Sequence, residues 1–132
     1  MNENQQQKMI ELQILNQQAE QLRQYLTQLE EQLENVKNLQ ESLDAIENEK
    51  IGKEMYSPLS SGIFVKTELK ENKEVLVAVG AGVIVKKNVK DAKKLLKEQE
   101  NKMELIFNNY KEQFERFAVS AANIEKELSE EQ

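Results

Sequence analysis

The chain of 132 residues has no cysteine, no histidine and no tryptophan, and it contains only one proline and four glycines. Without cysteine and histidine it cannot form a disulfide, a thiolate nucleophile or an imidazole ligand. These absences argue against a zinc site and exclude Ser-His-Asp and Cys-His catalytic centres. We therefore expect neither a metal nor a cofactor. Because proline and glycine are so rare, long uninterrupted helices are possible.

Long apolar segments are missing as well. No apolar run approaches the roughly 20 residues that a helix needs to cross a bilayer, and residues 1–7 are polar, unlike a signal peptide. Charged residues make up 32% of the chain and aromatic residues 5%, which is typical of a coiled coil rather than a compact core. We expect one unit over residues 1–132, soluble, cytoplasmic and without membrane contact.

The formal charge of −6 is distributed unevenly. Residues 1–50 carry 4 basic and 10 acidic side chains, residues 51–90 carry 7 and 4, and residues 91–132 carry 7 and 10. The two outer parts are therefore acidic and the middle is mildly basic. Because acidic helices repel a phosphate backbone, nucleic acid is not an expected partner.

Apolar residues recur at alternating steps of three and four in both halves of the chain, as in the seam of a coiled coil. In the first half they are Leu12, Leu15, Ala19, Leu22, Leu26, Leu29, Leu33 and Val36. In the second half they are Val89, Ala92, Leu96, Met103, Ile106 and Tyr110. A seam needs a partner helix, and the two halves can supply one another as a long antiparallel hairpin.

Two interruptions of the seam are predicted. Two consecutive steps of three between Leu33 and Leu39 predict local overwinding of the coil. Two consecutive steps of four between Ile106 and Phe114 predict local underwinding.

The middle of the chain has the period of β-strands. We predict helices over residues 4–50 and 88–132, the second capped by Asn88. Residues 51–87 predict two β-hairpins, with strands at 54–59, 63–69, 74–79 and 83–85. Two isolated hairpins cannot bury their apolar faces, so a sheet assembled from several subunits is favoured over a private sheet. The residues expected at this interface are Ile63, Val65, Val75, Val77, Val79, Val83 and Val85.

The middle of the chain also resembles a known family. Residues 56–66 read YSPLSSGIFVK, and residues 75–85 read VLVAVGAGVIV. With a helix on either side, this arrangement is similar to the alpha-class subunits of prefoldin, a molecular chaperone of archaea and eukaryotes. Beta-class subunits have a single hairpin, so two hairpins favour the alpha class, and the small size resembles the archaeal type.

The resemblance implies a mainly α fold with a small β part, in which a long antiparallel two-helix coiled coil is joined by two β-hairpins that assemble into an intersubunit β-barrel. It implies a hetero-oligomer of two alpha and four prefoldin beta subunits. Members of this family hold unfolded polypeptides at the coil tips and hand them to a group II chaperonin without ATP.

Candidate catalytic features have simpler explanations. Gly80 and Gly82 lack the third glycine and the Lys-Ser/Thr of a phosphate-binding loop, so a turn is favoured. The pairs Glu30-Glu31 and Glu130-Glu131 are expected on solvated helix faces. We predict that the protein is not an enzyme.

The ends of the two helical arms are the candidate client-binding site. Ile10, Ile14 and Val119 fall at outward positions of the heptads, where an apolar residue offers contact area to another chain. The full predicted set is Met9, Ile10, Leu12, Ile14, Leu15, Phe117, Val119, Ala121, Ile124 and Leu128. The alternative is that such residues are ordinary exposed side chains at fraying helix ends. The predicted function is an ATP-independent holdase, and the alternative is a structural coiled-coil spacer without unfolded clients.

Overall fold

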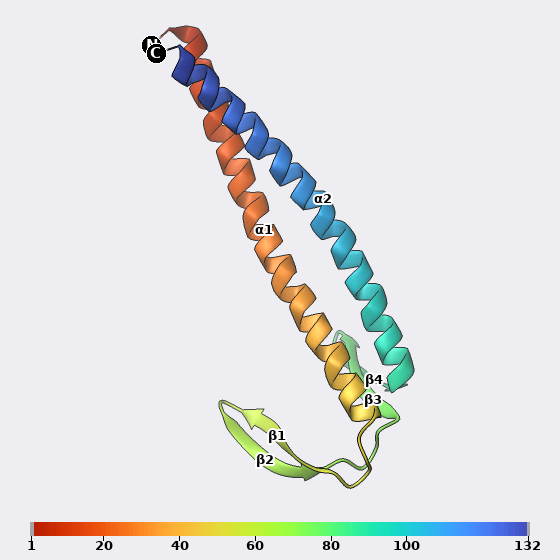
Figure 1. Ribbon diagram of the computed structural model, residues 1–132. Coiled ribbons are helices and arrows are strands. Elements are labelled where there is room, and N and C mark those ends of the chain that lie inside the picture. The colour runs from red at the N-terminus through yellow and green to blue at the C-terminus, as the bar shows by residue number, and fades with distance from the viewer. Residues whose placement is uncertain (1, 132) are drawn as a thin grey trace. The chain divides into compact units, whose positions relative to one another are not determined.

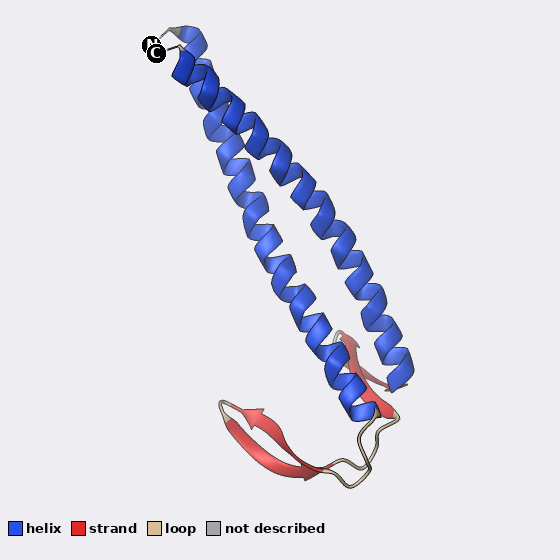
Figure 2. Ribbon diagram, in the orientation of Figure 1, coloured by secondary structure: helices blue, strands red, loops and turns tan. Residues whose placement is uncertain are grey.

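The computed structural model describes residues 2–131 as two long helices with two β-hairpins between them in the sequence (Figures 1 and 2). The elements are α1 (Glu3–Glu47), β1 (Glu54–Ser60), β2 (Ile63–Glu68), β3 (Glu74–Gly80), β4 (Val83–Asn88) and α2 (Val89–Glu130). They divide into two compact bodies. Residues 2–34 with 101–131 form a terminal body, and residues 35–100 form a hairpin body, so each long helix contributes to both.

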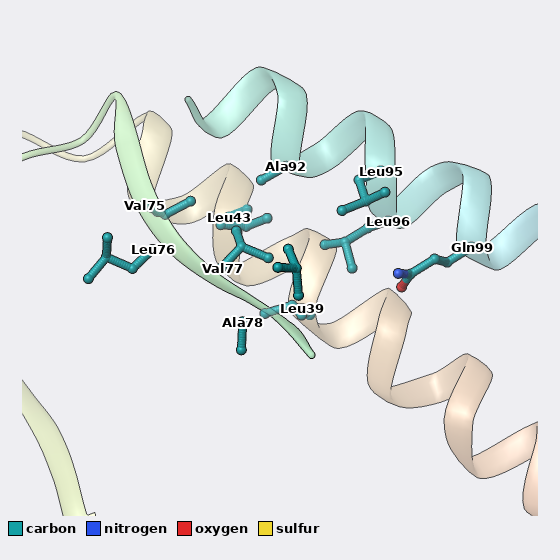
Figure 3. Close-up of a pocket in the computed structure, with 11 residues that line it drawn as sticks. Leu39, Leu43, Val75, Leu76, Val77, Ala78, Ala92, Leu95, Leu96 and Gln99 are labelled. Atoms are coloured by element: carbon teal, nitrogen blue, oxygen red, sulfur yellow. The ribbon is translucent and has the colours of Figure 1, made fainter. Parts of the chain in front are cut away.

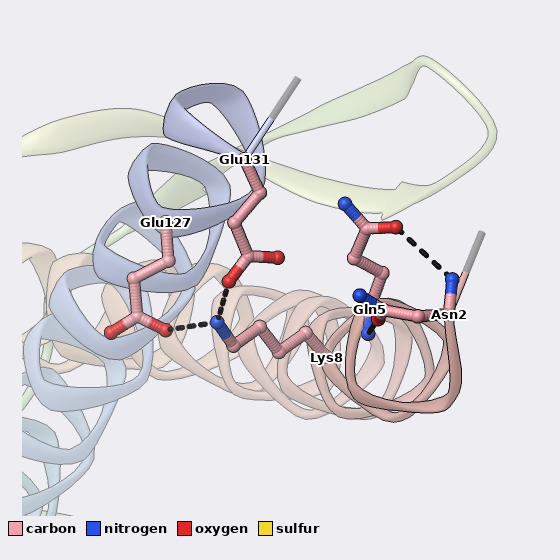
Figure 4. A network of polar contacts seen from close by, with 5 residues as sticks. All are labelled: Asn2, Gln5, Lys8, Glu127 and Glu131. Carbon is pink, nitrogen blue, oxygen red and sulfur yellow. Dashed lines mark hydrogen bonds and ion pairs between the residues drawn. The ribbon is translucent and has the colours of Figure 1, made fainter.

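Helix α1 begins with a reciprocal cap. The backbone N–H of Gln5 donates to Oδ1 of Asn2 at 2.8 Å, and the N–H of Asn2 donates to Oε1 of Gln5 at 3.2 Å (Figure 4). This arrangement satisfies donors that the first turn of a helix leaves without partners. At its other end the predicted boundary at Lys50 was wrong by three residues. The Asn48 side chain competes for the carbonyl of Asp44, and such local bonds favour a helix end.

Helix α2 begins as the sequence predicts. The N–H of Asp91 donates to Oδ1 of Asn88 at 2.7 Å, which confirms Asn88 as the N-cap. The carboxylate of Asp91 also lies in the first turn, where the helix dipole favours negative charge. The N–H of Val89 is satisfied by the carbonyl of Lys73 at 2.7 Å, which anchors the start of α2 to the loop before β3.

The predicted seam of α1 is confirmed from Leu12 to Val36, since all eight residues are buried or half-buried. The predicted interruption after Val36 was wrong. Leu39 is 49% exposed, whereas Gln40 is half-buried and Leu43 is buried. The seam of α1 therefore continues in regular steps, with a polar residue at the place where an apolar one was expected.

In α2 the interruption lies elsewhere than predicted. Ile106 is exposed, and Phe107 takes its place among the half-buried residues, so the steps from Phe107 to Phe114 are regular. Two consecutive steps of four instead join Ala92, Leu96 and Glu100. An insertion of this kind locally unwinds a coiled coil.

Within each body the two helix segments run antiparallel. In the terminal body the rings of Tyr25 and Tyr110 stack with their centroids 5.8 Å apart. In the hairpin body Lys93 pairs with Asp44 and lies 3.4 Å from Glu47. In both bodies, residues early in α1 contact residues late in α2, and residues late in α1 contact residues early in α2. The predicted antiparallel pairing is therefore confirmed.

Each hairpin is a two-stranded antiparallel sheet closed by a two-residue turn. The turn residues Ser61 and Gly62 have φ values of 47° and 82°, and Ala81 and Gly82 have 52° and 75°. Positive φ at both positions defines the turn type whose twist matches that of the paired strands. β4 runs to Asn88, three residues past the predicted end at Val85, because the polar residues Lys86 to Asn88 still pair with β3.

The two hairpins are an internal repeat with a period of 20 residues. The Lys-Glu pair at 53–54 recurs at 73–74, and Val-Lys at 65–66 recurs at 85–86. The strand registers correspond, and each pairing shifts just before its turn. A lysine also pairs with a glutamate in each hairpin, Lys66 with Glu54 at 3.0 Å and Lys86 with Glu74 at 3.4 Å. The corresponding outer surfaces therefore carry corresponding charges.

The main core of the hairpin body lies where β3 meets the two helices (Figure 3). Its buried residues are Leu43, Val89 and Ala92, and the partly buried Val75, Val77 and Leu96 pack against them. The strand β3 is thus fixed to its own helices through one face. This contact leaves the opposite face of β3, with Leu76, exposed.

Candidate functional site

The terminal body carries exposed apolar side chains at its helix ends. We call Met9, Ile10 and Ile14 of α1 and Val119 of α2 the terminal surface; Ile10 is 57% exposed and Val119 is 60% exposed. A shallow groove beside them is lined by Gln6, Met9, Ile10, Leu12, Gln13 and Asn16. A mixed lining of flexible methionine, aliphatic and amide side chains can adapt to different apolar segments.

The other predicted client-binding residues belong to the seam. Leu12, Leu15, Phe117, Ile124 and Leu128 are half-buried, and Ala121 is buried. These side chains pack within the terminal body rather than presenting a surface. They would become available to another chain only after the two helix ends separate.

Lys8 joins the two helix ends. Its Nζ lies 2.5 Å from Glu131 and 3.5 Å from Glu127, so one ammonium of α1 holds two carboxylates at the end of α2 (Figure 4). The hydrogen bond to Glu131 is the main reason that the pKa of Lys8 is raised. This ion pair opposes the separation that would expose the neighbouring seam residues.

Each hairpin exposes an apolar face that the sequence reasoning missed. We call Tyr56 and Phe64 of the first hairpin and Leu76 and Ile84 of the second the outer hairpin residues; Tyr56 and Leu76 are each 70% exposed. Tyr56 and Phe64 occupy positions that correspond to Leu76 and Ile84 in the internal repeat. Exposed aromatic and aliphatic residues at corresponding positions on two sheets are typical of an assembly surface.

The predicted interface residues divide into two groups. Ile63, Val65, Val79 and Val83 are exposed, and Val85 is half-buried. Val75 and Val77 are half-buried against the chain's own core. The apolar run from Val75 to Val79 includes residues on both faces of β3, which is the pattern of a strand covered on both sides and was the signal that could have identified Leu76.

An apolar cavity of about 660 Å³ lies beside the core of the hairpin body. Its lining is apolar apart from Gln99, and it includes the exposed Leu39 and Val79. Figure 3 shows Leu39, Leu95 and Gln99 in this lining. The lining offers no acid, base or nucleophile. Its chemistry suits contact with another apolar side chain rather than catalysis.

The candidate catalytic features have structural explanations. Gly80 ends β3 and Gly82 lies in the following turn, which confirms the prediction of a turn. Glu30 and Glu31 are exposed, and Glu131 pairs with Lys8. Within residues 2–131 there is no cluster of three or more acidic side chains able to hold a metal ion. None of the helices in this described part has an apolar stretch that could cross a membrane.

The chain thus combines two long helices, two β-hairpins and exposed apolar side chains on both. Comparison with known proteins identifies the family. Residues 15–132 match the prefoldin subunit family, and the chain belongs to that family. Prefoldins are chaperones that form oligomeric complexes, and the family is not one of enzymes.

The fold is also found among solved structures. The chain is similar to filamentous PFD from Methanocaldococcus jannaschii, solved by cryo-EM, with a TM-score of 0.76 and 16% sequence identity. The match covers 89% of this chain and 97% of the other. No curated protein sequence matches the chain. The predicted fold of two long helices and two small hairpins is therefore confirmed.

Proposed function

We propose that this chain is an alpha-class prefoldin subunit, an ATP-independent holdase that captures unfolded polypeptides at its helix ends and delivers them to a group II chaperonin. The observation that carries this proposal is the terminal surface, because Met9, Ile10, Ile14 and Val119 are exposed in a prefoldin-family chain. We propose that the protein is cytoplasmic and of the archaeal type, as its resemblance to archaeal alpha subunits implies. Cofactors are not required.

Client capture would rest on many weak contacts. A single exposed isoleucine offers a small apolar area, and its affinity for a client segment is correspondingly low. Several subunits in one assembly would raise the effective concentration of the remaining contacts once the first has formed. Affinity therefore accumulates without a deep pocket, and clients of unrelated sequence can be held.

The hairpins would build the assembly. We assign the chain to the alpha class because it has two hairpins, and we infer a complex of two alpha and four beta subunits joined through an intersubunit β-barrel. The outer hairpin residues and the predicted set Ile63, Val65, Val79 and Val83 supply exposed apolar area on both sheets. In this arrangement residues 51–87 serve oligomerisation, and residues 1–50 and 88–132 form the coiled coil of one prefoldin-like unit.

The alternative is a structural spacer that uses the same seam and the same hairpins without holding unfolded chains. The two functions differ at the terminal surface. A spacer needs no apolar residue at an outward heptad position, whereas a holdase does. Ile10 and Ile14 at such positions favour the holdase.

The test is the aggregation of a chemically unfolded protein on dilution, with this chain assembled with a beta subunit and without ATP. We expect suppression at near-stoichiometric complex. It should be lost when residues 1–20 and 118–132 are removed together, with the assembly retained in sedimentation. An intact assembly that suppresses nothing would establish the spacer instead.

A further inference from the structure

One charged residue of the described chain is buried. Glu100 of α2 is 5% exposed and lies in the seam, between Leu96 and Met103. A buried carboxylate is costly unless hydrogen bonds replace its hydration.

Two side chains satisfy this carboxylate. Nε2 of Gln40 donates to Oε2 of Glu100 at 3.0 Å across the helix pair, and Nζ of Lys97 donates to Oε1 at 2.9 Å from the same helix. These contacts lower the pKa of Glu100, with the hydrogen bond from Lys97 as the largest cause and a smaller charge effect from Lys37. Gln40 and Glu100 thus form a polar layer in the seam of the hairpin body.

We infer that the Gln40–Glu100 pair sets the axial register of α2 against α1. The apolar seam residues are mostly leucines and other aliphatic side chains at repeated spacing, so a slip of seven residues would still bring apolar residues together. The polar pair distinguishes the registers. A slip in one direction would bring Glu100 to Leu33, and a slip in the other would bring it to Glu47.

Of the two hydrogen-bond partners of Glu100, only Gln40 on α1 can distinguish one register from another. Lys97 lies on the same helix as Glu100, so it moves with the carboxylate and keeps its hydrogen bond in every register. Gln40 and Lys37 lie on α1 and would be left behind. A slipped state would therefore bury a carboxylate without its inter-helix donor, opposite either an apolar side chain or another carboxylate.

The place of the pair in the heptads supports this role. Glu100 ends the two consecutive steps of four that begin at Ala92, where the coil is locally unwound. On α1 the steps around Gln40 are regular. The polar pair therefore lies where the heptad of α2 changes phase, which gives α2 a second marker of axial position at the same level.

The test uses spin labels on the full chain, which has no native cysteine. Cysteines replacing the exposed Gln13 and Lys102 would carry labels that are offset along the helix axis, and the labelled chain is diluted with unlabelled chain. A slip of seven residues moves one helix by about 10 Å along the other. Pulsed electron paramagnetic resonance would resolve that displacement.

The decisive variant is Gln40→Leu with Glu100→Leu. It makes the seam apolar throughout, so it should fold with an equal or higher Tm, yet show a second distance population displaced by about 10 Å. Glu100→Gln keeps a polar pair and should retain one population. The exposed pair Asn38→Leu with Asn101→Leu adds the same apolar groups outside the seam and should also retain one. A single, unchanged population in the double leucine variant would overturn the inference.

Discussion

The rings of Tyr25 and Tyr110 stack across the terminal body at a centroid distance of 5.8 Å and an interplanar angle of 28°. Tyr110 is a half-buried seam residue of α2, whereas Tyr25 lies beside the seam of α1 and is 42% exposed. Tyr25 also accepts a hydrogen bond from Gln21 at 3.3 Å, which orients its hydroxyl along α1. The pair is therefore a specific contact between α1 and α2.

Replacing Tyr110 by alanine should lower the free energy of unfolding by about 1–3 kcal/mol, from the lost ring pair and part of a buried side chain. Thermal unfolding followed by circular dichroism measures the change. The control is Tyr25→Phe, which keeps both rings and loses only the bond from Gln21. Equal losses in the two variants would show that stacking contributes nothing.

The terminal surface can be tested without touching the seam. Ile10→Ser with Ile14→Ser should weaken suppression of client aggregation several-fold, because two exposed apolar contacts are lost. Assembly and Tm should be unchanged. Leu105→Ser with Ile106→Ser removes two exposed apolar side chains elsewhere on α2 and serves as the matched control. If the Ile10/Ile14 variant suppressed client aggregation as well as the wild type, these residues would not bind clients.

Neighbouring residues of β3 should separate assembly from folding. Leu76→Asp places a charge on an exposed face, so the chain should stay folded while the oligomer dissociates in sedimentation. Val77→Asp places the charge against Leu43 and Val89, and should also cost about 2–4 kcal/mol of folding stability. An oligomer of wild-type size with aspartate at either position would contradict the proposed barrel.

Lys8 should control fraying of the helix ends. Lys8→Gln removes the partner of Glu127 and Glu131, so amide hydrogen exchange in the last turns of α2 should become faster. Because the pKa of Lys8 is raised, the stability that the ion pair contributes should fall as the pH rises. The ion pair stabilises fully below the ordinary lysine value of 10.5 and is lost as the pH rises above it.

High salt should imitate the Lys8→Gln variant, because the carboxylate of Glu127 is exposed to screening. Lys126→Gln makes the same change of charge in an exposed position near the end of α2 and is the control. Identical exchange rates for the two variants would show that net charge, rather than the ion pair, governs the helix ends.

The second turn offers a stabilising substitution. Ala81 has a φ of 52°, which costs a side chain with a Cβ about 1 kcal/mol relative to glycine. Ala81→Gly should therefore leave the hairpin body as stable or slightly more stable, although glycine also loses more entropy on folding. Ala81→Val should destabilise it, because a β-branched residue is poorly tolerated at this φ. Chemical denaturation would rank the two variants, and a valine variant as stable as the glycine variant would contradict the strain at this position.

The long helices, the four strands and most of the seam could be predicted from the sequence because apolar spacing follows directly from helix and strand geometry. Gln40 and Glu100 could not, since a polar residue at a seam position looks like an outward one until its partner on the other helix is known. Assigning Leu39 and Ile106 to the seam was the corresponding error. Each has an apolar side chain, but Gln40 and Phe107 occupy the inward positions.

The hairpin faces illustrate a second limit. Alternation showed that Val75 and Val77 share a face, and the sequence reasoning assigned that face to a partner. Within this chain Val75 and Val77 are partly buried against its own helices, and Leu76 is exposed. Which side of a strand a distant helix covers depends on tertiary packing that a local period does not encode.

The repeated hairpin has a consequence for how many neighbours one subunit can join. If each hairpin joins one neighbour, a chain with two hairpins resembles a bifunctional monomer in polymer chemistry. A chain with one hairpin resembles a monofunctional monomer. In the proposed complex, two-hairpin chains would extend an assembly and single-hairpin chains would end it. The ratio of the two kinds of chain would then set the size of the particle, much as an end-capping reagent limits a growing polymer.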